Sequence, residues 1–186
     1  MSATSRSRVP SFAFALALAA VPLAGARVPS ATPALPQGVA VLVPDARAQG
    51  GGELKWFGLS IYHGYLWSVD DTFSFDEPFA LDLHYQRTLK GTLIAQRSVE
   101  EMRAIGRHAE ADLARWGEAM GRIFPDVSRG DHIVGVHLPG QGARFFHNGR
   151  PIGEIADPSF ARAFFGIWLD PRTSRPDFRR QLLGQT

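Results

Sequence analysis

The hydrophobic pattern changes period twice along this chain, and such a change separates strands from helices. From Phe79 to Arg87 apolar and polar residues alternate, which predicts a half-buried strand. Over Thr92–Ile105 and Glu110–Phe124 the apolar residues recur at helical spacing, which predicts two amphipathic helices. A strand-like apolar run returns over Asp131–Leu138. The chain must therefore combine a sheet with helices that lie in the middle of the sequence.

Two further segments extend the predicted sheet. Glu53–Trp67 is rich in aromatic and branched residues and predicts one long strand or two short ones, with glycines as bends. Ala143–Ile155 contains Asn148-Gly149, which favours a tight hairpin because a type I′ turn needs positive φ at both central residues. Consecutive strands joined in this way pair antiparallel.

The C-terminal part joins a very apolar run to a segment that breaks helices. The stretch "AFFGIWLDPRTSRP" (Ala163–Pro176) suits a membrane anchor, the wall of a cofactor pocket, or plain core. The apolar run is much shorter than the ~20 residues that span a bilayer, and Asp170-Pro171 ends a helix because the residue before proline avoids the helical region. We therefore expect a buried helix over Pro158–Trp168, a turn, and a last helix over Arg175–Leu183.

Strands, then helices, then a hairpin, then helices predict an α+β fold with a large antiparallel sheet and helices layered on one face. The 186 residues, 45% of them hydrophobic, suffice for one domain with a core of its own. We place this domain at residues 51–186. The oligomeric state stays open.

The N-terminus has the three parts of an export signal. Arg6 and Arg8 supply a positive region, "FAFALALAA" supplies an apolar stretch, and Ala24-Gly25-Ala26 supplies a cleavage site of small residues. We predict a signal peptide over residues 1–26, with Ala48 as a later cleavage site, and a proline-rich linker over residues 27–50. The protein is then exported to the periplasm, or anchored there by an uncleaved signal, with no other transmembrane span.

Composition excludes several classes of function. The chain has no cysteine, so disulfides and thiolate chemistry are absent. Four of the twenty basic residues and one of the eighteen acidic residues lie in the first 48, so the remainder carries a formal net charge of −1 and does not indicate nucleic-acid binding. The six histidines show no metal-ligand spacing, the Gly50–Gly52 run precedes a strand and does not suit phosphate, and no serine lies in a hydrolase motif. We predict no metal and no cofactor.

Several motifs together carry a resemblance to a known family. In order along the chain they are "LSIYHGYLW", "RSVEEMRAIG", "FPDVSRGD", "FFHNGRPIGEIADPSFARAFFGIWL" and "DPRTSRPDFRRQLLG". Their order and spacing over residues 51–184 resemble the bacterial, exported branch of the chalcone isomerase-like proteins. The resemblance implies the open-faced sandwich of that family, a large antiparallel sheet with helices on one face.

The resemblance also implies where catalytic residues would lie if this chain were an intramolecular lyase. A threonine that positions water corresponds to Ser60, the one weak catalytic candidate. The positions of a tyrosine and an asparagine hold Ile94 and Glu101, and the position of an arginine holds Ala48. Because loss of polarising donors costs orders of magnitude in rate, we expect no chalcone isomerase activity, with a divergent lyase or isomerase as the alternative.

Other proteins that share this fold bind fatty acids without catalysis, which implies a cleft between sheet and helices. The partner we expect is a small hydrophobic or amphipathic molecule, fatty-acid-like and bearing a carboxylate. An anion in an apolar cleft needs a hydrogen-bonded partner, and five residues near the strand ends are candidate ligand-binding anchors: Lys55, Ser60, Tyr62, Tyr85 and Arg87.

Overall fold

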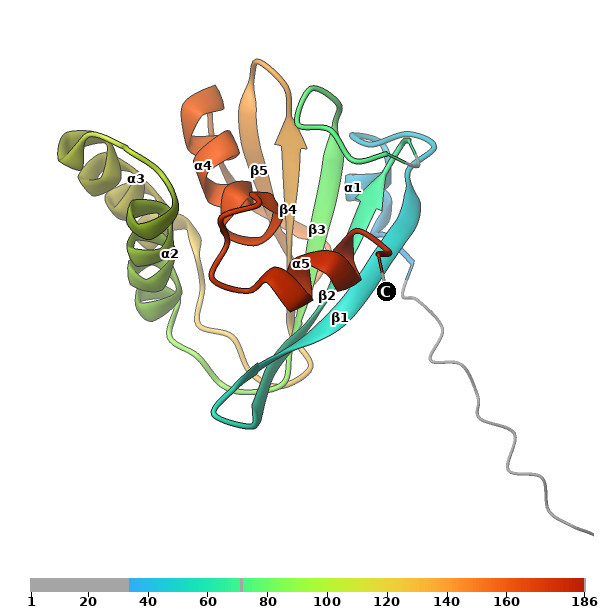
Figure 1. Cartoon of the computed structure of the whole chain (residues 1–186), viewed down its shortest axis with the longest axis horizontal. Helices are drawn as coiled ribbons and strands as arrows, with labels where there is room; N and C mark the ends of the chain where they lie inside the picture. The colour runs from blue at the N-terminus through green and yellow to red at the C-terminus, as the bar shows by residue number, and fades with distance from the viewer. Residues whose placement is uncertain (1–33, 71, 186) are drawn as a thin grey trace, which may run out of the picture. The chain divides into compact units, whose positions relative to one another are not determined.

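A computed structural model describes residues 34–70 and 72–185, and six strands form its centre (Figure 1). All neighbours pair antiparallel in the order β1-β2-β3-β4-β5-β6. The bounds are β1 (Arg47–Trp56), β2 (Leu59–Ser68), β3 (Phe79–Tyr85), β4 (His132–Leu138), β5 (Gly142–His147) and β6 (Arg150–Ile155). The expected α+β class and antiparallel sheet are confirmed.

The segment Glu53–Trp67 forms two strands and not one. Phe57 and Gly58 make the turn, with φ of 48° and 76°. The second hairpin turns at Asn148 and Gly149 with φ of 49° and 77°, as its sequence predicted. Asparagine tolerates this region and phenylalanine does not favour it, so only the second turn is visible in the sequence.

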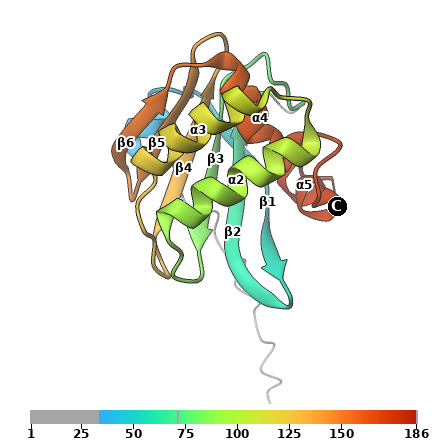
Figure 2. The same ribbon diagram turned by 90° about the vertical axis from the view of Figure 1, so that its left-hand side faces the viewer.

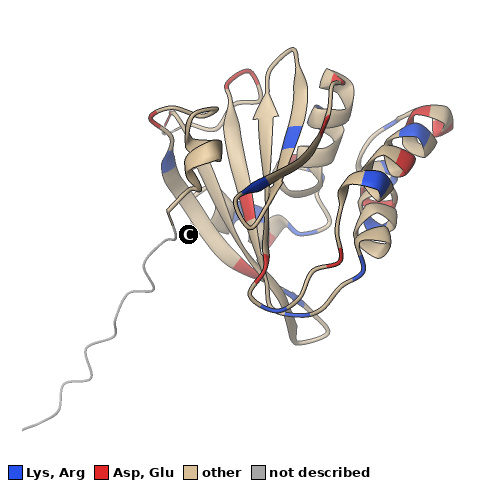
Figure 3. Ribbon diagram, turned by 180° about the vertical axis from the view of Figure 1, so that it is seen from behind, with Lys and Arg blue, Asp and Glu red and all other residues tan. Residues whose placement is uncertain are grey.

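Four helices lie over one face of the sheet (Figures 1 and 2). They are α2 (Gly91–Ile105), α3 (Glu110–Ile123), α4 (Pro158–Leu169) and α5 (Pro176–Leu182). In Figure 2, α2 and α3 cross in front of the strands, and Figure 3 shows that they carry many charged residues of both signs. None of the helices in the described part of the chain has the length and apolar character that a membrane-spanning helix requires.

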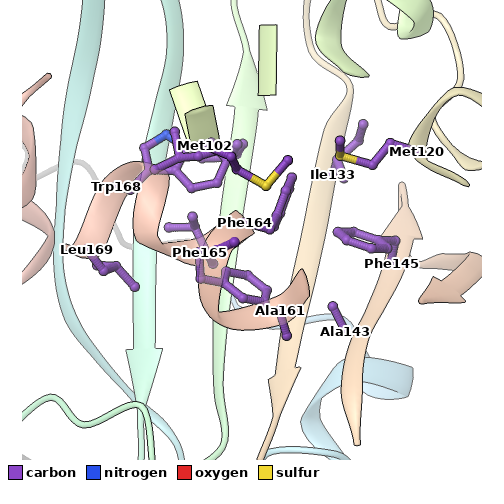
Figure 4. Packing of buried hydrophobic residues seen from close by; sticks show 14 of the residues in the cluster. Met102, Met120, Ile133, Ala143, Phe145, Ala161, Phe164, Phe165, Trp168 and Leu169 are labelled. Carbon is purple, nitrogen blue, oxygen red and sulfur yellow. The ribbon is translucent and has the colours of Figure 1, made fainter. Parts of the chain in front are cut away.

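Helix α4 is the centre of the main core. Asp157 caps its first turn by accepting hydrogen bonds from the backbone N–H groups of Ser159 and Phe160. The helix ends at Leu169, before Asp170-Pro171, as expected. Figure 4 shows Phe164 and Phe165 of this helix among side chains from the strands and from α2 and α3. The apolar run near the C-terminus is therefore core.

The segment before the first strand differs from the expected linker. Residues 27–33 lie outside the described residues, but Gln37–Ala40 form the short helix α1, and β1 begins at Arg47, before the boundary expected at residue 51. Val39 and Val43 are buried in a second, smaller cluster with β3, β4 and β5 residues on the face opposite α4. Burial of these two valines holds the segment on the sheet in spite of its prolines.

The Gly50–Gly52 run in β1 has a packing role. A Cβ on Gly50 would lie 2.3 Å from the carbonyl oxygen of Gln181, and one on Gly52 would lie 1.9 Å from its side chain. The C-terminal end of α5 therefore approaches β1 more closely than any larger residue would permit. This contact closes one side of the helix layer.

Candidate functional site

A cavity of ≈ 430 Å³ lies between the sheet and the helices. Strands β1 to β5, helices α2 and α4, and the segments that flank the helices all contribute to it. Much of the lining is apolar, and its central members are Leu81, Leu83, Ile94, Phe124, Phe145 and Phe164. This size is within the range of cavities that hold small molecules, and the lining offers an apolar ligand better solvation than water does.

One part of the lining, which we call the mouth, holds all of its charged side chains and consists of Trp56, Arg97, Glu101, Ser174 and Arg175. Four of them also line a shallower depression outside, together with Phe57. Trp56 and Phe57, at the turn between β1 and β2, are 42% and 89% exposed. The mouth therefore combines exposed aromatic side chains with charged ones.

The two arginines of the mouth differ in their partners. Arg97 forms ion pairs with Glu100 and Glu101, and Glu101 also accepts a hydrogen bond from the Ser174 hydroxyl at 2.9 Å. Arg175 lies over the ring of Trp56, 4.5 Å from its centroid. Among the described residues its guanidinium has no hydrogen bond to an acceptor and no ion pair. Arg175 is thus the cation of the mouth that is free to bind an anion.

The two tyrosines that the sequence singled out lie in the cavity lining. The Tyr62 hydroxyl accepts a hydrogen bond from Trp168 Nε1 at 2.8 Å, and the tyrosine rings meet edge-on. Burial raises the pKa of Tyr62 to about 12, although the Trp168 hydrogen bond and the charge of Arg175 oppose this. Burial also raises the pKa of Tyr85. Both remain neutral phenols at physiological pH and can donate to an anion.

The other three predicted anchors, all within the described range, lie outside the lining of this cavity. Lys55 Nζ lies 2.9 Å from the Glu53 carboxylate. The Ser60 hydroxyl and the Lys55 ammonium lower the pKa of Glu53. Arg87 is exposed after the end of β3. The structure therefore brings Tyr62 and Tyr85 together and leaves Lys55, Ser60 and Arg87 elsewhere.

Arg175 was missed because nothing local distinguishes it. It lies in a turn of the C-terminal segment, far along the chain from Trp56, and only the packing of α5 against β1 brings the two together. Ile94 and Glu101, considered from the sequence as substitutes for catalytic residues, do line the cavity. Neither Ile94 nor the paired Glu101 supplies a free donor there.

Comparisons with known proteins agree with the fold. Residues 70–184 match the family described as chalcone isomerase-like. The chain is 30% identical over 138 residues to an uncharacterized protein of Haemophilus influenzae, covering 74% of this chain and 67% of that protein. A solved structure, the Arabidopsis thaliana fatty-acid binding protein AtFAP1, superposes with a TM-score of 0.59 at 13% identity, covering 75% of this chain and 87% of the other.

Proposed function

The chain belongs to the chalcone isomerase-like family, and on this premise we propose that it is a non-catalytic binding protein for a fatty-acid-like carboxylate. The acyl chain occupies the cavity between the sheet and α4. The carboxylate lies at the mouth, against Arg175 and the hydroxyl of Tyr62. The fold shared with a fatty-acid binding protein supports this proposal.

The observation that carries the proposal is an arginine without an acidic partner at the mouth of an apolar cavity. The Arg175 guanidinium lies over the Trp56 ring and lines the cavity. Contact with the ring limits the freedom of the arginine side chain before an anion binds, so less freedom is lost on binding. Arg97, by contrast, is already neutralised by two glutamates. An unpaired carboxylate in an apolar cavity is costly, and a bidentate pair with the Arg175 guanidinium would remove that cost.

The lining also favours binding over an isomerase reaction. Of the positions that the resemblance associates with catalysis, Ile94 is apolar, Glu101 is engaged by Arg97 and Ser174, and Ser60 lies outside the lining. A reaction that develops charge on an oxygen needs donors aimed at that oxygen. The Tyr62 hydroxyl, near Arg175, suits a bound carboxylate better than a reacting enone.

Calorimetry with saturated carboxylates from octanoate to palmitate tests the proposal. Each added methylene that enters the cavity should tighten binding about fourfold, from about 0.8 kcal/mol of burial, until the cavity is full. Arg175→Gln should weaken binding roughly 10- to 150-fold, the worth of a charge-assisted hydrogen bond of about 1.5–3 kcal/mol. Lys55→Ala, outside the cavity, is the matched control. Affinity that ignores chain length, or equal losses in both variants, would contradict the proposal.

We also propose that the protein acts in the periplasm after export. The supporting pattern lies in residues 1–26, outside the described residues, and consists of the positive region, the apolar stretch and the Ala24-Gly25-Ala26 site. Cleavage after Ala26 keeps Val39 and Val43, which cover the second face of the sheet, whereas cleavage after Ala48 removes both. We therefore expect Arg27 to be the first residue of the exported protein.

A further inference from the structure

A group of polar side chains lies on the face of the sheet opposite the cavity. Asp82 and His84 of β3 share this face because they are two residues apart on a strand. His132 of β4 is the direct cross-strand neighbour of His84, and His63 of β2 is its neighbour on the other side. The three histidines therefore form one row across three adjacent strands.

Asp82 lies between two of these histidines and contacts both. Its Oδ2 is 2.9 Å from His84 Nε2, and its Oδ1 is 3.0 Å from His132 Nδ1. The imidazole rings of His84 and His132 are stacked, with centroids 4.8 Å apart. One ligand atom from each of the three residues lies within 4.8 Å of the other two. The three side chains thus bring ring nitrogens and carboxylate oxygens close together on this face of the sheet.

The Asp82 side chain is buried, whereas the two histidine side chains are partly exposed and can be reached by a ligand from solvent. The Asp82 side chain is 1% exposed, whereas those of His84 and His132 are 27% and 20% exposed. Burial opposes ionisation of Asp82, but hydrogen bonds from His132 and His84 outweigh it and hold the pKa of Asp82 below its ordinary value. Among the described residues, the only side chains that contact the buried Asp82 carboxylate through a hydrogen bond or ion pair are these two imidazoles, so no lysine or arginine balances its charge.

We propose that Asp82, His84 and His132 form a binding site for a divalent transition metal such as Zn²⁺. Two imidazole nitrogens and one carboxylate oxygen are a ligand set that these ions prefer, and the fourth position is open to water. Zinc holds such ligands at about 2.0–2.2 Å, so two of them lie at most about 4.4 Å apart. Small rotations of the two imidazole rings therefore bring all three atoms into range.

The neighbours of the site would hold it in place. The Tyr65 ring packs edge-on against His84, with centroids 5.5 Å apart, and Tyr65 is the cross-strand partner of Asp82. This ring contact restricts the orientation of the His84 imidazole. The site was not visible in the sequence because its ligands come from two strands, and only their register places His132 beside His84.

Titration of the full-length protein without its signal, freed of metal by EDTA and dialysis, tests the proposal. Calorimetry with zinc chloride should show one saturable site per chain, and zinc should raise the melting temperature. His84→Gln and His132→Gln should each weaken zinc binding by more than about tenfold. The glutamine amide can still donate to Asp82, so both variants should fold, which circular dichroism checks.

His147→Gln is the matched control, because His147 lies near Asp131 and outside the group. It should bind zinc as the wild type does. Cobalt titration gives an independent readout, since its visible absorption reports the ligand geometry and should be lost in the His84 and His132 variants. A protein that binds no zinc saturably, or whose double variant His84→Gln, His132→Gln binds it as tightly as the wild type, would overturn the proposal and leave a purely structural His–Asp–His cluster.

Discussion

In strand β3 the side chains of Leu81, Leu83 and Tyr85 lie toward the helices, whereas those of Asp82 and His84 lie on the other face. The first face is covered by four helices and encloses a cavity. The second has a small apolar cluster under α1 and, beside it, a polar row of histidines. One sheet thus supports two environments, and the alternation of side chains along each strand decides which residue meets which.

The two faces differ in whether they favour the neutral or the charged form of a histidine. On the helix-covered face His137 is buried, stacks on Phe79 and donates from Nε2 to the carbonyl of Phe75. Burial lowers the pKa of His137, so it stays neutral. On the other face the carboxylate of Asp82 raises the pKa of His132 in spite of partial burial. Apolar surroundings thus disfavour the protonated form of His137 on one face, and the buried Asp82 carboxylate favours the protonated form of His132 on the other.

Leucine truncation on each face gives the largest expected effect. Leu66 of β2 is fully buried in the main core, and Leu138 of β4 lies in the second cluster at 9% exposure. We expect Leu66→Ala to lower the free energy of unfolding by about 4 kcal/mol and Leu138→Ala by about 2 kcal/mol, because the helix layer cannot collapse into the space that Leu66 leaves. Urea denaturation measures both. Equal losses would show that the two faces are equally well packed.

Proteins that begin at different residues test how much Val39 and Val43 stabilise the second face of the sheet. A protein that begins at Gln49 lacks Val39 and Val43, and should be less stable by about 3 kcal/mol than one that begins at Arg27, since a buried valine contributes about 1.5–3 kcal/mol. Thermal unfolding of the two lengths measures this. N-terminal sequencing of the exported protein should begin at Arg27. A native start at Gln49 with undiminished stability would show that the second cluster needs no cover.

The two histidines should give opposite pH dependences, with differences of about 1 kcal/mol. The raised pKa of His132 adds stability that is full below the unfolded pKa of 6.5 and is lost as the pH rises through the folded value. The lowered pKa of His137 adds stability that is present above 6.5 and is lost as the pH falls through the folded value. His132→Gln should therefore cost more at about pH 5 than at about pH 9, and His137→Gln the reverse.

Denaturation at both pH values, with EDTA present to remove metal ions, measures the two differences. Wild-type protein in the same buffers is the reference for each variant. If both substitutions changed stability with the same sign of pH dependence, the contrast between a histidine with a lowered pKa under the helices and one with a raised pKa on the other face would be wrong.

Local patterns in the sequence predicted most of the fold. The alternation from Phe79 to Arg87 marked a strand whose Leu81 and Leu83 meet the helices, because side-chain direction on a strand follows from position alone. Asn148-Gly149 predicted its hairpin because those residues suit positive φ. Phe57-Gly58 forms the same turn without that signal, so the first hairpin stayed undecided between one strand and two.

The site could be predicted only in part. Tyr62 and Tyr85 were named from the family resemblance and from their place near the ends of predicted strands, and both line the cavity. The side of the sheet on which Lys55 lies was not predicted from the sequence, since β1 changes register between Leu54 and Lys55. The segment before Arg47 looked like a linker because burial of two valines leaves no periodic pattern.

By itself the sequence determined the class of fold, the apolar and polar faces of its regular strands, and the family resemblance, because these follow from local periodicity and motifs. The tertiary structure alone decided which distant residues meet: Arg175 on Trp56 at the mouth of the cavity, and His132 beside Asp82 and His84 on the other face. Such meetings depend on strand register and on the packing of α5 against β1. A local sequence pattern predicts neither the register nor this packing, because both arise from contacts between segments that are far apart along the chain.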